Sequence, residues 1–116
     1  MIDAWIDVND SLKTPEYNVI TLDAYNMRVR YRKILNIAEL DIESTDYNLP
    51  VNSDITLCTL PEGYRPKDRS FPFPEGYNLK STSNSHFFLG TNGALILQNY
   101  GTTEVRNPAG HCVYLV

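Results

Sequence analysis

The residues best suited to bind a ligand are aromatic side chains placed among short polar ones. Tyr47, Tyr77 and Tyr100 each lie in a polar segment that also carries Asn or Asp, and Trp5 lies between two aspartates. Aromatic rings stack on the apolar C–H faces of sugars or hold a quaternary ammonium group, while amides and carboxylates bind sugar hydroxyls. The sequence therefore predicts a ligand surface made of Trp5, Tyr47, Tyr77 and Tyr100. The alternative is that these tyrosines only pack the loops onto the fold, because tyrosine also suits strands.

The chain offers little that could carry catalysis or hold a metal ion. Asp41 and Glu43 are the two carboxylates that could be considered as a glycosidase pair, but they alternate with core residues on a solvated face opposite arginines, where neither carboxyl is expected to be desolvated. His111 and Cys112 are adjacent, so on a strand their side chains point to opposite faces and cannot chelate one ion. No nucleotide-binding or hydrolase motif is present. We therefore predict that the protein is not an enzyme and has no catalytic residue, metal site or cofactor.

The clearest pattern in the chain is an alternation of charge within residues 26–43. Apolar residues alternate first with arginines and then with carboxylates, which predicts a hairpin with one buried face and one charged face. The charged residues are Arg28, Arg30, Arg32, Glu39, Asp41 and Glu43. A turn centred on Ile34-Leu35 places Arg30 opposite Glu39, whereas a slip of two residues keeps the same faces and pairs Arg32 with Glu39. Cross-strand pairing explains the arginine row, and a polyanion site is the alternative.

A second hairpin is predicted at residues 87–97. Asn92-Gly93 is a strong signal for a two-residue type I′ turn, in which both residues have positive φ. The resulting cross-strand pairs are Leu89–Ile96 and Phe88–Leu97. Because both faces are apolar, one must be covered by a second sheet or by another subunit. The Phe88–Leu97 pair and Trp5 are therefore the candidates for a subunit interface.

The remaining segments have the pattern of short strands separated by turns. Further strands are expected at residues 2–8, 19–22, 55–60, 77–80 and 111–115. The strand at 55–60 is apolar on both faces and is expected to be central, whereas the proline-rich residues 61–76 and the polar residues 44–54 and 99–110 are expected to be irregular. No sustained 3.6-residue periodicity occurs. The chain is therefore predicted to be all-β, an antiparallel β-sandwich (jelly-roll-like) with little or no helix, and a single domain spanning residues 1–116.

Composition excludes several kinds of protein. The formal net charge is −4, from 10 basic and 14 acidic residues, which argues against non-specific nucleic-acid binding. No apolar run is long enough for a transmembrane helix, and no secretory signal is expected at the N-terminus. Cys58 and Cys112 lie in apolar, strand-like runs and are expected to be free buried thiols, with a single disulfide as the alternative.

A rigid turn is encoded by the sequence LPEGYRP at residues 60–66. Pro61 suits the second position of a turn, Gly63 can adopt positive φ, and Pro66 keeps the residue before it extended. These properties predict a stiff turn that closes the β-fold. The alternative is a loop that presents Tyr64 and Arg65 to a ligand.

The order of motifs from residue 27 to residue 116 resembles the end of receptor-binding tail proteins of siphophages that infect Gram-positive bacteria. The motifs are a strand followed by LPEGYRP, the aromatic-proline stretch FPFP at residues 71–74, and the turn sequence TNG at residues 91–93. The upstream stretch YRKILNI at residues 31–37 is similar to the R-K-[ILV]-G-N-[IV] stretch that precedes the motif in that family. Leu35 stands where the family commonly has glycine.

The resemblance implies a function at the surface of a bacterium. It implies the distal C-terminal domain of a longer fibre, located in the virion at the tail tip, that recognises host cell-wall polysaccharide or teichoic acid during adsorption. It also implies a homotrimer in the intact fibre, and folding in a reducing cytoplasm, which fits free thiols. No nucleic acid or membrane is expected as a partner. The alternatives are a purely structural tail-fibre or baseplate scaffold and a carbohydrate-binding module of a cell-wall enzyme.

Overall fold

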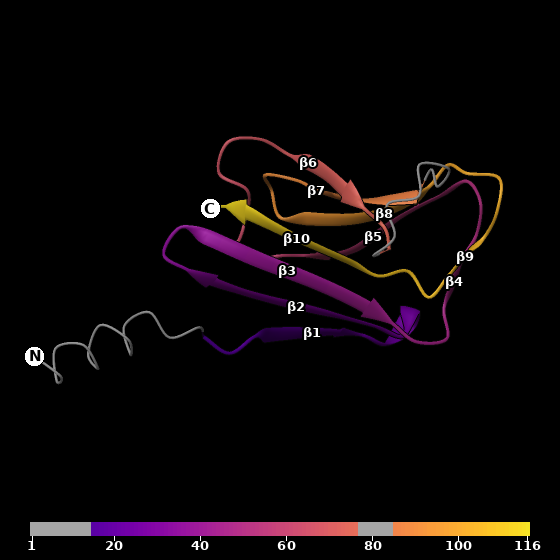
Figure 1. Cartoon of the computed structure of the whole chain (residues 1–116), viewed down its shortest axis with the longest axis horizontal. Coiled ribbons are helices and arrows are strands. Elements are labelled where there is room, and N and C mark those ends of the chain that lie inside the picture. Colours follow the sequence, from indigo (N-terminus) through magenta and orange to yellow (C-terminus); the bar gives the residue numbers. More distant parts are fainter. Residues whose placement is uncertain (1–14, 77–84) are drawn as a thin grey trace, which may run out of the picture.

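The computed structural model describes residues 15–76 and 85–116 (Figure 1). Ten strands and one short 3-10 helix make up the regular structure of these residues, which include no α-helix. The strands expected at residues 2–8 and 77–80 lie outside the described residues. The prediction of an all-β fold with antiparallel pairing is confirmed.

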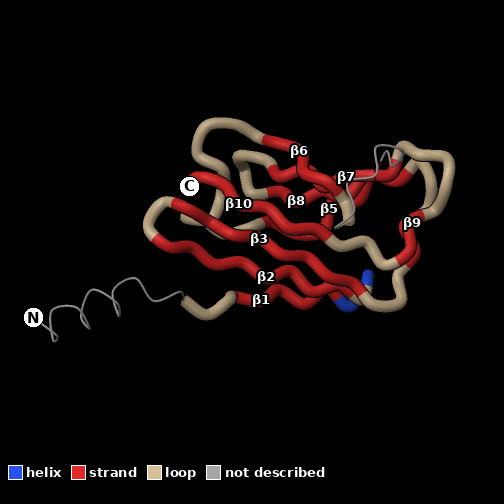
Figure 2. Tube along the Cα trace, in the orientation of Figure 1, coloured by secondary structure: helices blue, strands red, loops and turns tan. Residues whose placement is uncertain are grey.

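Two four-stranded antiparallel sheets face each other across the core (Figure 2). The first, here the β1 sheet, has the order β1 (Asn18–Leu22), β2 (Met27–Ile34), β3 (Ile37–Ser44) and β10 (Gly110–Leu115). The second, here the β5 sheet, has the order β5 (Ser53–Thr59), β8 (Ala94–Asn99), β7 (Ser85–Leu89) and β6 (Phe71–Pro74). The 3-10 helix η1 (Asp23–Tyr25) joins β1 to β2. The arrangement is a β-sandwich.

The chain changes sheets twice, and both crossings occur at one end of the sandwich. The crossings run from β3 to β5 and from β8 to β10, and they are joined by a two-stranded ribbon of β4 (Asn48–Leu49) and β9 (Val105–Arg106). This end, on the right in Figure 1, also carries η1. We call it the crossover end. The turns between β2 and β3 and between β7 and β8 lie at the opposite end. Residues 44–54 and 99–110 were expected to be loops only, and β4 and β9 correct that prediction.

The core consists of the inward faces of both sheets. Its fully buried side chains are Met27, Val29, Leu40, Ile42, Leu49, Leu60, Phe87, Leu89, Leu95 and Leu97. Ring contacts occur within and between the sheets: Phe73 stacks on Phe87 of the same sheet at 5.1 Å between centroids, and the Phe71 ring lies 5.5 Å from the Tyr114 ring of the opposite sheet. Aromatic pairs of this kind stabilise a core by about 0.5–1.5 kcal/mol beyond the area they bury.

The β2–β3 hairpin adopts the second of the two predicted registers. Ile34 pairs with Ile37, so the turn consists of Leu35 and Asn36 and Arg32 lies opposite Glu39. Alternation of apolar and charged residues could not select this register, because a shift by two residues leaves every side chain on the same face. Leu35 has φ 54°, a left-handed conformation in which glycine is preferred.

The β7–β8 hairpin differs from the prediction. Gly93 has φ 87° but Asn92 does not adopt positive φ, so the turn is not type I′. Instead Gly93 N–H donates to Gly90 O at 2.9 Å, and the Asn92 side chain accepts from Ala94 N–H at 3.0 Å, which makes a four-residue loop. The longer loop shifts the register by one residue, so Phe88 pairs with Ile96 while Leu97 is buried in the core. The proposed Phe88–Leu97 interface pair was therefore wrong.

Two further expectations about strands were also wrong. The strand at 55–60 is β5, which lies at an edge of its sheet and not at the centre. A β-bulge between Thr56 and Cys58 breaks the alternation, which explains why the run looked apolar on both faces. Residues 71–74, expected to be irregular, form the opposite edge strand β6, where the missing N–H groups of two prolines are tolerated.

The LPEGYRP segment closes the end of the sandwich opposite the crossover end, which confirms that it is a structural turn. Tyr64 N–H donates to Pro61 O at 3.2 Å and Gly63 has φ 91°, so Pro61 occupies the first position of the turn and not the second. The Tyr64 ring meets the Tyr31 ring edge-on at 4.8 Å, and the Tyr114 hydroxyl donates to Tyr64 O at 2.7 Å. Both contacts are with the β1 sheet, so Tyr64 attaches the segment that follows β5 to the opposite sheet.

The two cysteines are free thiols, as predicted. Each residue is partly buried. Burial raises the pKa of the Cys58 thiol to about 11 and that of the Cys112 thiol to about 12.

Candidate functional site

Two of the four predicted ligand residues fall within the described part of the chain. Trp5 and Tyr77 lie outside the described residues. Tyr47 and Tyr100 both belong to the crossover end. Their rings have different neighbours: Tyr47 contacts Tyr25 of η1, whereas Tyr100 contacts His86 of β7.

Tyr47 packs a loop onto the sandwich, as the alternative reading predicted. Its ring meets Tyr25 edge-on at 5.6 Å between centroids and contacts the hydrophobic core. Its backbone N–H donates to Asn107 Oδ1 at 3.0 Å, and Asn107 N–H donates back to Tyr47 O at 2.7 Å. Burial raises the pKa of the Tyr47 phenol. This ring is partly buried and takes part in the packing of the fold.

Tyr100 is the exposed tyrosine of the described residues, with 54% of its surface accessible. Its hydroxyl lies 3.4 Å from Asp54 Oδ2, the Gln98 amide donates to the same oxygen at 3.3 Å, and the ring lies 6.0 Å from the His86 ring. We call these four side chains the Tyr100 cluster. It combines an open ring with a carboxylate, an amide and an imidazole, which together can bind the face and the hydroxyls of a sugar.

Strand pairing brings the Tyr100 cluster together on the outer face of the β5 sheet. Gln98 lies directly opposite Asp54 on β5 and opposite His86 on β7. The loop that carries Tyr100 is fixed by Asn99, which is 1% exposed. Its amide donates to Leu49 O, Pro50 O and Thr103 O at 3.0–3.3 Å, and its carbonyl oxygen accepts from Gly101 N–H. A buried side chain therefore holds the backbone of the loop that carries Tyr100, so that binding would order little additional backbone.

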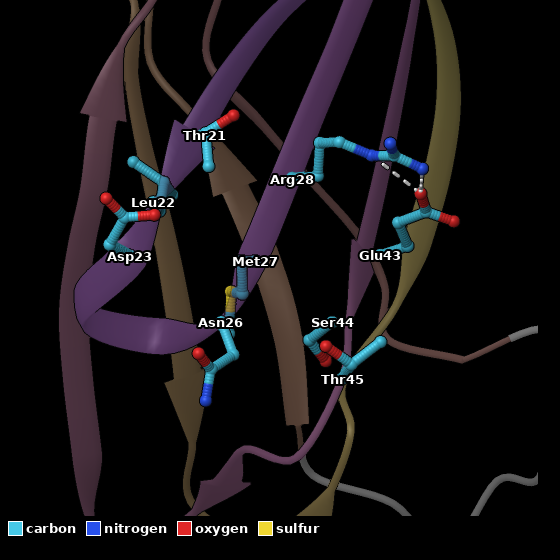
Figure 3. A pocket seen from close by; sticks show the side chains of 9 residues that line it. All are labelled: Thr21, Leu22, Asp23, Asn26, Met27, Arg28, Glu43, Ser44 and Thr45. Atoms are coloured by element: carbon cyan, nitrogen blue, oxygen red, sulfur yellow. Dashed lines mark hydrogen bonds and ion pairs between the residues drawn. The ribbon is translucent and has the colours of Figure 1, made fainter.

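A polar groove of about 570 Å³ opens at the same end of the sandwich, beside the β1 sheet (Figure 3). It is lined by Thr21, Leu22, Asp23, Asn26, Met27, Arg28, Glu43, Ser44 and Thr45. Arg28 donates through Nε and a terminal nitrogen to Glu43, and this pairing lowers the pKa of the Glu43 carboxyl. The volume is within the range of small-ligand sites, and seven of the nine lining side chains have polar groups that can form hydrogen bonds.

The arginine row on the outer face of the β1 sheet is internally neutralised. Arg28 pairs with Glu43, Arg30 with Asp41, and Arg32 with Glu39. Tyr17 covers part of this row: its ring lies 3.9 Å from the Arg32 guanidinium, and its hydroxyl donates to Glu39. That hydrogen bond lowers the pKa of the Glu39 carboxyl and raises that of the Tyr17 phenol. Because each guanidinium already has a carboxylate, the row favours cross-strand pairing over the polyanion alternative.

The comparisons with known proteins give no family for this β-sandwich: no protein-family model matches the sequence, and no curated protein matches it. Within residues 15–76 and 85–116, no helix is long and apolar enough to cross a membrane. In the same residues no group of His, Cys, Asp and Glu side chains is placed to hold a metal ion.

Sequence reasoning missed most of the residues that surround Tyr100. Asp54 and Gln98, the two most distant of these residues, are 44 positions apart in the sequence. Only the strand order β5-β8-β7 brings them into one row with His86. The groove was missed because it lies at the junction of η1 with the ends of β2 and β3. The charge alternation that located Arg28 and Glu43 was the one available signal.

Proposed function

We propose that this chain is the receptor-binding domain of a phage tail protein, located at the tail tip, which recognises a glycan or teichoic acid of the host cell wall during adsorption. The observation that carries the proposal is the Tyr100 cluster. It offers an exposed ring, on a loop whose backbone is held by a buried asparagine, beside hydrogen-bonding groups on the outer face of the β5 sheet. Rings that are fixed before binding gain contact area at low entropic cost.

The packing of the motifs supports the resemblance on which the proposal also rests. The LPEGYRP segment and the TNG turn contact each other directly, because Leu60 N–H donates to Gly93 O at 2.8 Å. Within the segment, Arg65 Nε donates to Leu60 O at 3.0 Å. The two motifs therefore belong to one structural unit, which is a reason for them to occur in the same chain.

The test is to replace Tyr100 by alanine and by phenylalanine and to measure binding to purified host cell walls together with thermal stability. Loss of one aromatic contact is expected to weaken Tyr100→Ala binding roughly two- to tenfold, with Tyr100→Phe intermediate, and with both variants folded as wild type. Glu104→Gln, an exposed change on the same loop, is the control and is expected to bind normally. Unchanged wall binding by Tyr100→Ala would refute the assignment.

A scaffold role is favoured by a different observation, at the end opposite the crossover end. Four apolar residues there are strongly exposed: Leu35 at 82%, Ile37 at 48%, Val113 at 57% and Leu115 at 52%. Apolar residues gathered in this way are suited to contact with another subunit. We propose that this region, in place of the Phe88–Leu97 pair, contributes to a homotrimer in the intact fibre. Sedimentation of the intact fibre protein as a monomer would refute it.

A further inference from the structure

The described residues that line the polar groove at the crossover end include no aromatic side chain and more negative than positive charge. Its charged side chains are Asp23, Arg28 and Glu43, one cation against two carboxylates. Arg28 is paired with Glu43. Asp23 has no hydrogen-bond or ion-pair partner for its carboxylate among the described residues, so one negative charge is left to face a ligand (Figure 3).

Several acceptor oxygens of the groove keep hydrogen-bonding capacity for a ligand, beside the unused donors of Arg28, Asn26 and the two threonines. The Asn26 side-chain amide donates to Asp46 O at 3.2 Å, and its side-chain oxygen Oδ1 has no hydrogen-bond partner among the described residues. The Ser44 hydroxyl donates to Pro108 O at 2.6 Å. Arg28 directs both of its contacts to Glu43 Oε1, so Glu43 Oε2 has no arginine partner. A ligand that complements Asp23, Asn26 and Glu43 must therefore supply hydrogen-bond donors and positive charge.

We propose that this groove binds a primary ammonium group carried beside hydroxyls, as on a de-N-acetylated amino sugar or an aminoacyl ester of a polyol. A primary ammonium offers three N–H donors for the oxygens of the groove. A quaternary ammonium offers none and is held by rings, which the groove lacks. The inference deepens the proposed function, on which it rests for the assumption that the ligand is a cell-wall polymer.

The groove is separate from the Tyr100 cluster, although both lie at the crossover end. The cluster is on the outer face of the β5 sheet, whereas the groove is lined by η1 and the ends of β1, β2 and β3. An extended polymer that spans both could stack one sugar on Tyr100 and place an ammonium near Asp23. Simultaneous binding at both sites would raise the overall affinity for the polymer, even where the affinity of each site alone is low.

The experiment compares glucosamine oligomers with N-acetylglucosamine oligomers of equal length in a titration of the full chain, followed by amide chemical shifts. The wild type is expected to bind the glucosamine oligomer more tightly, with shifts at Asp23, Asn26 and Thr45. Asp23→Asn is expected to weaken glucosamine binding roughly two- to fivefold, as for an exposed ion pair, and Asp23→Lys to abolish the preference. The control Asp68→Asn, exposed at the other end of the sandwich, is expected to keep it.

A second arm distinguishes the two sources of ammonium. Alanyl-esterified teichoic acid is titrated before and after mild alkaline removal of its esters, and loss of binding to the groove on ester removal identifies the aminoacyl source. Equal affinity of the wild type for acetylated and free amino sugars, with no ester dependence, overturns the inference while leaving wall binding through Tyr100 intact. Shifts at Asp23 with free amino sugars, but no binding to walls, would instead refute the proposed function and retain the groove.

Discussion

Replacing Gly93 by alanine is expected to lower the free energy of unfolding by more than the cost of placing a non-glycine residue at positive φ. Gly93 has φ 87°, and a non-glycine residue in that region costs about 1–2 kcal/mol. A Cβ atom there would lie 2.5 Å from Leu60 O and 2.7 Å from Arg65 Nε, distances at which the neighbours must move. These neighbours belong to the LPEGYRP segment that closes the sandwich.

The movement would disturb two hydrogen bonds, from Leu60 N–H to Gly93 O and from Arg65 Nε to Leu60 O. Each contributes about 0.5–1.5 kcal/mol. Together with the backbone term, the expected loss is about 2–5 kcal/mol. For a domain of this size that corresponds to a fall in Tm of roughly 8–20 °C.

Gly63→Ala is a matched control that separates the two contributions. Gly63 has φ 91°, but its added Cβ would meet only Lys33 Nζ, at 2.9 Å, the free end of a flexible side chain. We expect Gly63→Ala to cost only the backbone term of about 1–2 kcal/mol. Both variants are measured by denaturant unfolding and by calorimetry. Equal losses for the two variants would show that the contact between the Gly93 turn and the LPEGYRP segment does not constrain residue 93.

Three further predictions concern the stability of the fold and the reactivity of its thiols. Leu35→Gly relieves a left-handed conformation at φ 54° and is expected to stabilise the domain by up to about 1 kcal/mol in denaturant unfolding; a lower midpoint would contradict the turn geometry. The Tyr17 hydroxyl lowers the pKa of Glu39, and Arg28 lowers the pKa of Glu43. The two carboxylates therefore stabilise the folded state at pH values above the unfolded-state pKa near 4.5, and this stabilisation is lost as the pH falls below that value. The double variant Glu39→Gln/Glu43→Gln should therefore flatten the dependence of unfolding free energy on pH between about 5 and 3, and an unchanged slope would contradict this. Cys58 and Cys112 have raised pKa values of about 11 and about 12, so the native protein should react slowly with a thiol reagent at pH 8 and release two thiols on unfolding without reductant; rapid native reaction, or no thiols on unfolding, would contradict it.

The sequence alone was sufficient for the fold class and for the faces of the best-patterned strands. Side chains on a strand point alternately to its two faces. This alternation places Arg28, Arg30 and Arg32 on one face and Val29 on the other. Likewise Gly63 and Gly93 were expected at positive φ, because glycine adopts that conformation without steric cost. These properties depend on neighbours in the chain.

Only the tertiary structure decided strand order, register and the composition of the site. The pairing of β5 with β8 brings Asp54 beside Gln98 across 44 positions, and no local pattern encodes that choice. The role of each tyrosine was equally undetermined, since Tyr47 and Tyr100 lie in similar polar segments. Tyr47 is packed against Tyr25 and Tyr100 is open because the crossings between sheets place the two loops differently over the core. Burial is a property of the assembled fold, so the sequence could propose these rings but could not tell which of them remains free to bind.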